Sequence, residues 1–173
     1  MLSALNGPLD ALVLFVAEAP GRLGADRTGV PLSQDRSGQN FDRLLADAGL
    51  ARADVFITNA VLCNPRDPGD RNRPPGPDEL ANCLSHLSAQ VDLVSAPIVA
   101  TLGVTALQAL DRIEPHGVHL REQVGRALPW RHRVLIPLYH PSAQAMLHRP
   151  FELQRRDYRA LAELARGLPG STS

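Results

Sequence analysis

The sequence contains no lysine, so all 18 of its basic residues are arginines. A Schiff base formed by a lysine side chain is therefore excluded. Cysteine is scarce: Cys63 and Cys83 are the only two, and such a widely spaced pair does not suggest a disulfide framework. No apolar run approaches the ~20 residues of a membrane-spanning helix, and the chain does not open with the basic flank of a signal peptide. We therefore expect a soluble, cytoplasmic protein.

Charge and length narrow the class of protein further. The formal net charge is zero, so the basic excess of many nucleic-acid-binding proteins is missing. With 173 residues, 44% of them hydrophobic and 21% charged, the chain is long and apolar enough to fold around a core. It has no internal repeat. We expect a single domain over residues 1–173, with its core at about 11–166 and a frayed tail from Gly167 to Ser173.

Strand and helix patterns alternate along the chain. The run from Ala11 to Ala17 is continuously apolar, as in a strand buried on both faces. Further strands are expected at 55–58, 98–102 and 133–138. Apolar residues at helical spacing predict helices around 41–48, 78–94, 104–110 and 158–165. This alternation predicts a three-layer α/β/α sandwich with a four-stranded, mainly parallel central sheet.

Polar residues collect where the predicted strands end. Glu18 follows the first strand, Asn59 the second and His140 the fourth. Parallel strands end at the same edge of a sheet, so we expect this acid, amide and imidazole to meet there. In an open parallel sheet, ligands bind beyond the carboxyl ends of the strands. Each has a structural alternative: Glu18 can simply precede a Pro-Gly turn, Asn59 can stabilise its own turn, and His140 can be a partly buried structural residue. Their coincidence at one edge favours a functional site.

Five segments carry a resemblance to a known family. They are Ala17-Glu18-Ala19-Pro20-Gly21, the segment from Ile57 to Pro65, the helix start from Pro77 to Cys83, Ala100-Thr101-Leu102-Gly103, and Tyr139-His140-Pro141-Ser142 with Arg149 after it. In this order and with similar gaps, from Leu12 to Arg166, the set resembles the family 4 uracil-DNA glycosylases. Each motif is short, and it is the ordered set that is specific.

The resemblance implies a reaction and roles for named residues. The reaction is hydrolysis of the glycosidic bond after a damaged nucleotide is flipped out of DNA. Glu18 and His140 would be catalytic, with Glu18 orienting or activating water near the sugar and His140 donating to uracil O2. Asn59 would pair with O4 and N3–H of uracil. The other substrate-binding residues implied are Ala17, Ala19, Gly21, Leu32 and Ser142.

The loop after His140 is implied to contact DNA. Met146 and Leu147 would fill the gap left by the flipped base, and Arg149 would hold a phosphate. The alternative for Met146 and Leu147 is that they pack a short helix against the core. Three arginines of the proline-rich loop also have two interpretations, contact with the DNA backbone or solvation; they are Arg66, Arg71 and Arg73.

The sequence departs from the family pattern in four places. Ala17 replaces a glycine, Asn64 stands where an arginine is common, and Leu32 stands where a phenylalanine usually stacks on uracil. The family also binds an iron–sulfur cluster with four cysteines, and the first pair, in an N-terminal Cys-x-x-Cys segment, is missing. Because such a cluster needs four thiolates and only Cys63 and Cys83 remain, we expect no cofactor and no metal.

Together these features predict a monofunctional DNA glycosylase of base excision repair that acts on uracil or another deaminated base in DNA. Because lysine is absent, we expect base release without strand cleavage. The alternative is a non-catalytic or weakly active member of the same fold that binds lesions, since Leu32 supplies no stacking ring. A Rossmann-type nucleotide-binding enzyme is disfavoured because no G-x-G-x-x-G follows the first strand. We expect a monomer that binds DNA and no membrane.

Overall fold

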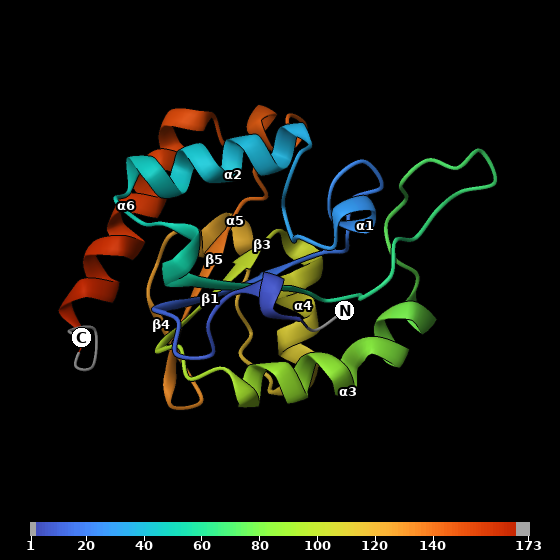
Figure 1. The fold of residues 1–173 in the computed structure, drawn as a ribbon. Helices are drawn as coiled ribbons and strands as arrows, with labels where there is room; N and C mark the ends of the chain where they lie inside the picture. The colour runs from blue at the N-terminus through green and yellow to red at the C-terminus, as the bar shows by residue number, and fades with distance from the viewer. Residues whose placement is uncertain (1–2, 169–173) are drawn as a thin grey trace.

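A five-stranded sheet forms the centre of the computed structural model, which describes residues 3–168 (Figure 1). The strand order is β2-β1-β3-β5-β4. Four strands are parallel: β1 (Val13–Ala17), β2 (Val55–Asn59), β3 (Ile98–Leu102) and β5 (Arg133–Leu138). The fifth strand, β4 (Leu128–Trp130), pairs antiparallel with β5. The predicted α/β architecture with a mainly parallel sheet is therefore confirmed.

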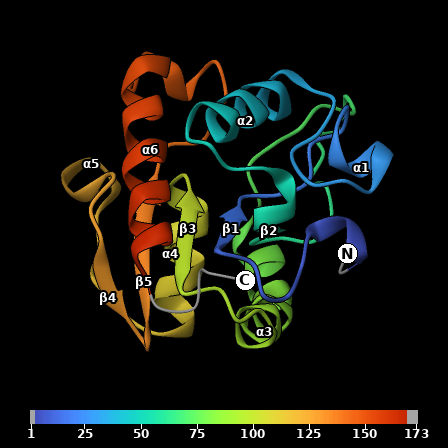
Figure 2. The same ribbon diagram turned by 60° about the vertical axis from the view of Figure 1, so that its left-hand side comes forward.

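Helices cover both faces of this sheet (Figures 1 and 2). On one face lie α2 (Arg36–Asp47) and α6 (Phe151–Gly167), and on the other α3 (Pro77–Leu93) and α4 (Val104–Ile113). Side chains alternate along the strands. Phe15 packs against Phe41 and Tyr158 on the α2–α6 side, whereas Leu14 faces the α3–α4 side. Because the central strand β1 is buried on both faces, its sequence reads as an unbroken apolar run.

Short helical segments connect these elements. They are α1 (Ala25–Thr28), α5 (Leu120–Gln123) and the 3-10 turns η1 (Ala4–Asn6), η2 (Arg52–Asp54) and η3 (Ala145–Leu147). The tail expected from Gly167 to Ser173 lies outside the described residues from position 169 on, and Gly167 itself ends α6. Within residues 3–168, none of the helices has the length and apolar character needed to cross a bilayer.

The sheet has five strands, and the prediction of four was wrong. The additional strand, β4, is three residues long and contains Pro129, which has no N–H to donate to a neighbouring strand. A segment this short has no readable strand period. It forms the edge of the sheet through a tight turn in which Arg131 has a φ of 52°. Trp130 anchors the strand, because its buried ring donates from Nε1 to the Glu114 carbonyl at 2.9 Å.

Candidate active site

The carboxyl ends of the parallel strands open into one cavity of about 550 Å³. Glu18 follows β1, Asn59 ends β2, and His140 follows β5, and all three line this cavity. The parallel register aligns the strand ends, pairing Ala17 with Asn59. The connecting loops supply further lining residues: Ala19, Gly21, Leu32, Asp35, Ser142 and His148. The structure thus brings the acid, the amide and the imidazole together, as the strand assignment predicted.

The Asn59 amide lies in the cavity wall and is available to bind a ligand. The residue is only 7% exposed, although it ends β2, the outer strand of the parallel part of the sheet. No hydrogen bond joins this amide to another described residue, although it lines the cavity. A buried amide that makes no hydrogen bond to protein is costly. Its donor and acceptor therefore both remain available for a molecule that enters the cavity.

His140 lies in the same wall as a neutral imidazole. Burial lowers the pKa of His140 from its ordinary 6.5 to about 4, although the Asp35 carboxylate acts in the opposite direction. The ring is therefore uncharged at neutral pH and carries one N–H donor. Like Asn59, it makes no hydrogen bond to another described residue. It can donate to an oxygen of a bound molecule without first giving up another partner.

Glu18, by contrast, is already held by the protein. Its Oε2 accepts a hydrogen bond of 2.5 Å from Oγ1 of Thr105, in the first turn of α4. The helix N-terminus places partial positive charge near this carboxylate. Its other oxygen, Oε1, has no hydrogen-bond partner among the described residues. One oxygen is fixed and the other is left for a ligand or a water molecule.

A close backbone approach shapes the loop that carries Leu32. Leu32 has a φ of 47°, a left-handed conformation that is unusual for leucine. A Cβ at Gly38 would lie 2.6 Å from the Leu32 carbonyl oxygen, so only glycine fits there. The Arg52 guanidinium donates to the same carbonyl and, at 2.7 Å, to that of Pro31. Leu32 therefore has a defined place, in contact with both the cavity and the core under α2.

Asp35 links this loop to the turn after β1. Its Oδ1 caps α2 by accepting from the Gly38 N–H at 2.8 Å. Its Oδ2 lies where a side chain at position 21 would extend, since a Cβ on Gly21 would come within 2.9 Å of it. The cavity thus contains a second carboxylate beside Glu18. The sequence does not single out Asp35, because it lies in the loop between α1 and α2, which contains glycine, proline and serine and follows no strand end.

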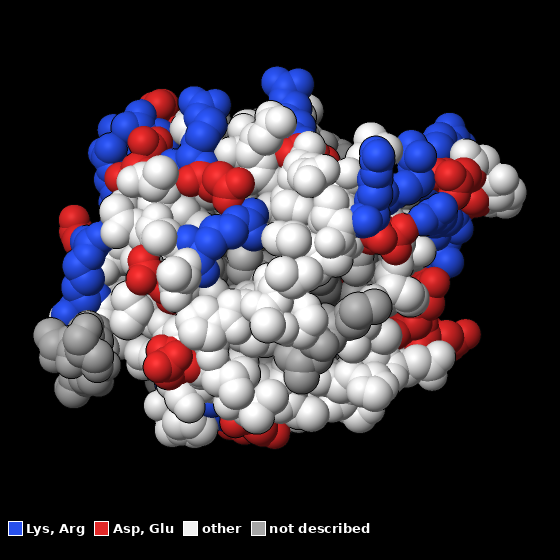
Figure 3. Space-filling model, viewed as in Figure 1, with Lys and Arg blue, Asp and Glu red and all other residues white. Residues whose placement is uncertain are grey.

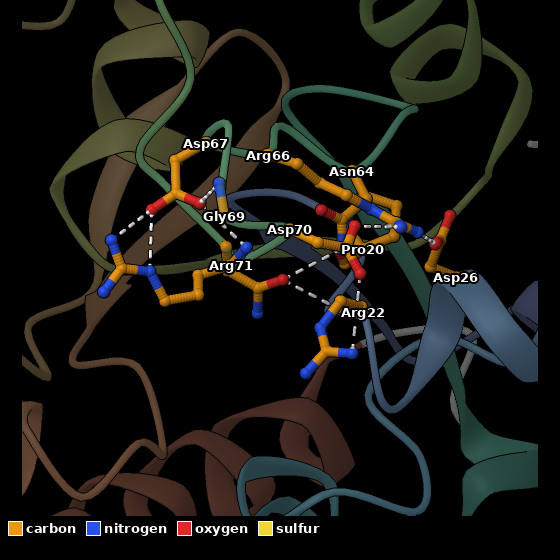
Figure 4. Close-up of polar contacts among 10 residues, drawn as sticks. Pro20, Arg22, Asp26, Asn64, Arg66, Asp67, Gly69, Asp70 and Arg71 are labelled. Carbon is orange, nitrogen blue, oxygen red and sulfur yellow. Dashed lines mark hydrogen bonds and ion pairs between the residues drawn. The ribbon is translucent and has the colours of Figure 1, made fainter.

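Residues 64–76 form a projecting segment, the arm, beside α1 (Figures 1 and 4). Arg66 bridges Asp26 of α1 and Asp70 of the arm, the latter at 2.6 Å. Arg22 lies 3.8 Å from Asp70. The Asn64 side chain donates to the Pro20 carbonyl at 2.8 Å. The arm is therefore tied to the loop after β1 by polar contacts, and both segments line the cavity.

The arm arginines were expected either to contact the DNA backbone or to be solvated, and the structure pairs each of them with a carboxylate instead, so blue and red atoms lie side by side over the arm (Figure 3). Arg66 pairs as described, Arg71 contacts Asp67 at 2.8 Å, and Arg73 contacts Glu79 at 2.7 Å. The Arg73 ion pair lowers the pKa of Glu79 to about 2. Each positive charge of the arm thus has a carboxylate beside it, so the arm is not a strongly basic surface.

The loop after β5 differs from expectation in one respect. Arg149, expected at a phosphate, contacts the buried Asp157 of α6 through two hydrogen bonds of 2.7 and 2.5 Å. This pair fixes the end of the loop that carries His140. Met146 is half-buried and Leu147 is 81% exposed, and neither lines the cavity. The exposed Leu147 therefore does not pack against the core.

Ala17 is the one predicted substrate-binding residue that lies away from the cavity. Its side chain is 1% exposed and packs in the α2–α6 layer with Phe15, because alternate residues of β1 point to the same face. The other predicted pocket residues all line the cavity. The sequence does not single out Thr105, which holds Glu18. It lies only two positions after Gly103, the last residue of the Ala-Thr-Leu-Gly segment at the end of β3.

The cysteines do not form a cluster site in the described part of the chain. Cys63 is exposed, and the Cys83 sulfur, half-buried on α3, accepts a hydrogen bond from the Leu62 N–H at 3.5 Å. Among residues 3–168, no three His, Cys, Asp or Glu side chains gather as ligands for a metal ion. The residues present therefore do not fit an iron–sulfur cluster, which needs four thiolates.

Comparison with known proteins agrees with this geometry. The sequence model of the uracil DNA glycosylase superfamily matches residues 5–162. A type-4 uracil-DNA glycosylase of Thermotoga maritima is 35% identical over 151 residues, 87% of this chain and 74% of that protein. The type-4 enzyme of Archaeoglobus fulgidus is 32% identical over 89% of this chain and 77% of its own length. A type-5 uracil-DNA glycosylase of Thermus thermophilus is 32% identical over 80% of this chain and 68% of that protein. Since both the superfamily match and these relatives cover most of its length, the chain belongs to the uracil-DNA glycosylase superfamily and resembles its type-4 members.

Proposed function

We propose that this protein is a DNA glycosylase that hydrolyses the N-glycosidic bond of uracil, or of another deaminated base, in DNA. The observation that carries the proposal is a single cavity in which Glu18 meets two polar side chains without hydrogen bonds to the protein, Asn59 and His140. The curated relatives named above, all uracil-DNA glycosylases, support the same activity.

In this proposal the flipped base lies between Asn59 and His140. A carboxamide offers one donor and one acceptor, which match O4 and N3–H of uracil. The walls of the pocket are Leu32 on one face of the base and the backbone near Ala19 and Ser142 around its edge. Thymine would be excluded at Gly21, because the Asp35 carboxylate lies beside it. A methyl group held against a carboxylate would take water from that charge without replacing it.

Breaking the C1′–N1 bond leaves positive charge on the sugar and negative charge on the base. Glu18 faces the sugar in this proposal, stabilises the cation, orients the attacking water and takes the proton that this water loses as its oxygen bonds to C1′. His140 donates its N–H to O2 as the base becomes an anion. Because the pKa of His140 is about 4, the imidazole acts as a hydrogen-bond donor and does not transfer a proton to the base. The base is uncharged before the bond breaks, so the hydrogen bond from His140 becomes stronger only as negative charge develops on O2. The donor therefore stabilises the transition state more than the bound substrate.

Exposed side chains beside the cavity could contact the DNA that surrounds a flipped nucleotide. Arg36 and Arg121 are exposed, each next to a lining residue, and neither forms an ion pair with another described residue. We propose that they contact phosphates and that Leu147 enters the base stack in place of the flipped base. Met146, half-buried in the same 3-10 turn, is proposed to contact the DNA beside it. Arg149 acts mainly through Asp157, and its phosphate contact stays a prediction.

Base release without strand cleavage and without a cluster completes the proposal. Strand cleavage needs an amine nucleophile, and the sequence has no lysine. Residues 3–168 would fold without an iron–sulfur cluster, since Cys63 and Cys83 cannot supply its ligands alone. Iron and sulfide measured in anaerobically purified protein would be near zero. One iron and one sulfide per chain, or more, would contradict the proposal that the protein has no cluster.

A weakly active lesion-binding protein is the second candidate, and Leu32 favours it. A leucine covers one face of the base but provides no ring, and base–aromatic stacking is worth about 1–3 kcal/mol. Such a protein would bind uracil-containing DNA while releasing little or no base. Turnover separates the two candidates.

The test measures free base released from oligonucleotides with uracil, hypoxanthine, xanthine or a thymine mismatch. We expect release of uracil with no strand break before alkali. Asn59→Ala and His140→Ala should each lower the single-turnover rate by about 100- to 1,000-fold, as for loss of a donor to a developing anion. Asn82→Ala and His86→Ala, exposed positions on α3, are matched controls with wild-type rates. No release from any oligonucleotide would refute the glycosylase.

A further inference from the structure

A single hydrogen bond joins the carboxylate of the cavity to the helix after β3. The Thr105 hydroxyl donates to Glu18 Oε2 at 2.5 Å, across 87 positions of sequence. It donates to the residue that follows the neighbouring strand β1, and it forms no hydrogen bond with the described backbone of its own helix. Thr105 itself is absent from the cavity wall, so it does not reach the base. Among residues 3–168, the Thr105 hydroxyl forms one hydrogen bond, to Glu18, which lines the cavity.

The position of Thr105 is itself fixed from the other side of the site. Gly103, the N-cap residue of α4, donates from its N–H to the Leu138 carbonyl of β5 at 2.8 Å. Its φ of 99° is a conformation that suits glycine and few other residues. Two residues after Leu138 comes His140. The start of α4 is therefore hydrogen-bonded to β5, the strand that precedes His140. Through Thr105 it is also hydrogen-bonded to the Glu18 carboxylate.

We propose that Thr105 is the positioning residue of Glu18, holding one carboxylate oxygen so that the other faces the sugar of the flipped nucleotide. The inference rests on the proposed function of the cavity. A carboxylate on a flexible side chain can rotate away from a cation that forms only transiently. Fixing Oε2 before the reaction means that Oε1 needs no reorientation when the sugar becomes positive.

The decisive variant is Thr105→Val, which keeps the shape of the side chain and removes the hydroxyl. Thr105→Ser restores a donor. Thr101→Val is the matched control, because Thr101 lies buried in β3 and its hydroxyl has no hydrogen-bond partner among the described residues. All three are combined with Glu18→Ala. Each change preserves a packed α4 or β3, and thermal unfolding checks that the variants fold.

The first readout is single-turnover uracil release. We expect Thr105→Val to lower the rate by about 10- to 100-fold, as for a hydrogen bond to a charged group, with KM changed less than twofold. Thr105→Ser should recover most of the rate, and Thr101→Val should keep all of it. In the Glu18→Ala background, Thr105→Val should add no further loss, because both changes remove the same action.

The second readout needs no turnover. Oligonucleotides carry either a cationic pyrrolidine or a neutral tetrahydrofuran in place of the target sugar, and the wild-type protein should bind the cationic one more tightly. Thr105→Val and Glu18→Ala should reduce this preference, whereas Thr105→Ser and Thr101→Val should retain it. If base release fails but the preference follows this pattern, the glycosylase proposal is wrong and the positioning role stands.

Three results would overturn the role of Thr105. One is a Thr105→Val protein with the wild-type rate and the wild-type preference for the cationic sugar. Another is that Thr105→Val lowers the rate of the Glu18→Ala protein by the same factor as that of the wild type, which would mean that Thr105 acts on the structure in general. The third is a wild-type protein with no preference between the two sugars, because then no carboxylate is held against the cation.

Discussion

The half-buried imidazole of His140 makes the stability of the protein depend on pH in a predictable window. In the unfolded chain the pKa of His140 is the ordinary 6.5, and in the folded protein burial lowers it to about 4. Between these values the unfolded chain binds a proton that the folded protein does not. Acid therefore favours unfolding, and the stability falls as the pH falls from 6.5 toward 4.

The size of the effect follows from the same two values. They differ by about 2.5 units, and each unit corresponds to about 1.36 kcal/mol. The folded protein should thus lose about 3 kcal/mol of unfolding free energy between pH 7 and pH 4 through His140 alone. That is a large part of the 5–15 kcal/mol typical of a domain.

Urea unfolding at several pH values, for the wild type and for His140→Gln, measures this contribution. Glutamine does not titrate, whereas the carboxylates and the other histidines act in both proteins alike. The difference between the two stability curves should therefore rise by about 3 kcal/mol from pH 4 to pH 7 and then level off. Parallel curves over this range would show that His140 is not held neutral by burial, and the account of a neutral donor to the base would fall with it.

Three further predictions concern the walls and anchors of the cavity. Leu32→Phe should raise uracil release several-fold by restoring a stacking ring, and an unchanged rate in a folded variant would show that position 32 does not cover the base. Arg149→Met should lower the unfolding free energy by about 2–3 kcal/mol in urea melts, because it leaves the Asp157 carboxylate buried without its cation; a loss under 0.5 kcal/mol would contradict the pairing. Gly21→Ala should weaken substrate binding at least several-fold in KM, since the new methyl lies 2.9 Å from Asp35, and a normal KM would mean that the carboxylate moves freely.

The strands and the edge they share could be predicted because each strand is sandwiched between two layers of helices. Such strands must be apolar on both faces, so β3 and β5 stand out in the sequence with the bounds the structure gives them. Parallel strands then end at the same edge, and polar residues just beyond them must meet. The positions of Glu18, Asn59 and His140 follow from this rule alone.

Contacts between loops and helices could not be predicted in the same way. Arg149 finds its partner on α6, eight positions later, only because the chain turns into the helix at Pro150. Thr105 reads as an ordinary residue in the first turn of a helix until β1 and β3 are placed side by side. β4 carries no strand pattern at all. Each depends on a long-range arrangement that no local period encodes.

The internally paired arginines of the arm bear on how tightly salt controls binding to DNA. A cation that already has a carboxylate beside it displaces few condensed ions from a phosphate backbone, and released counterions are what make such binding sensitive to salt. With the arm charges paired and a formal net charge of zero, we expect a shallow dependence of affinity on ionic strength. Recognition would then be carried by the base in the cavity. The protein should stay on a lesion at salt concentrations that remove a strongly basic protein from DNA.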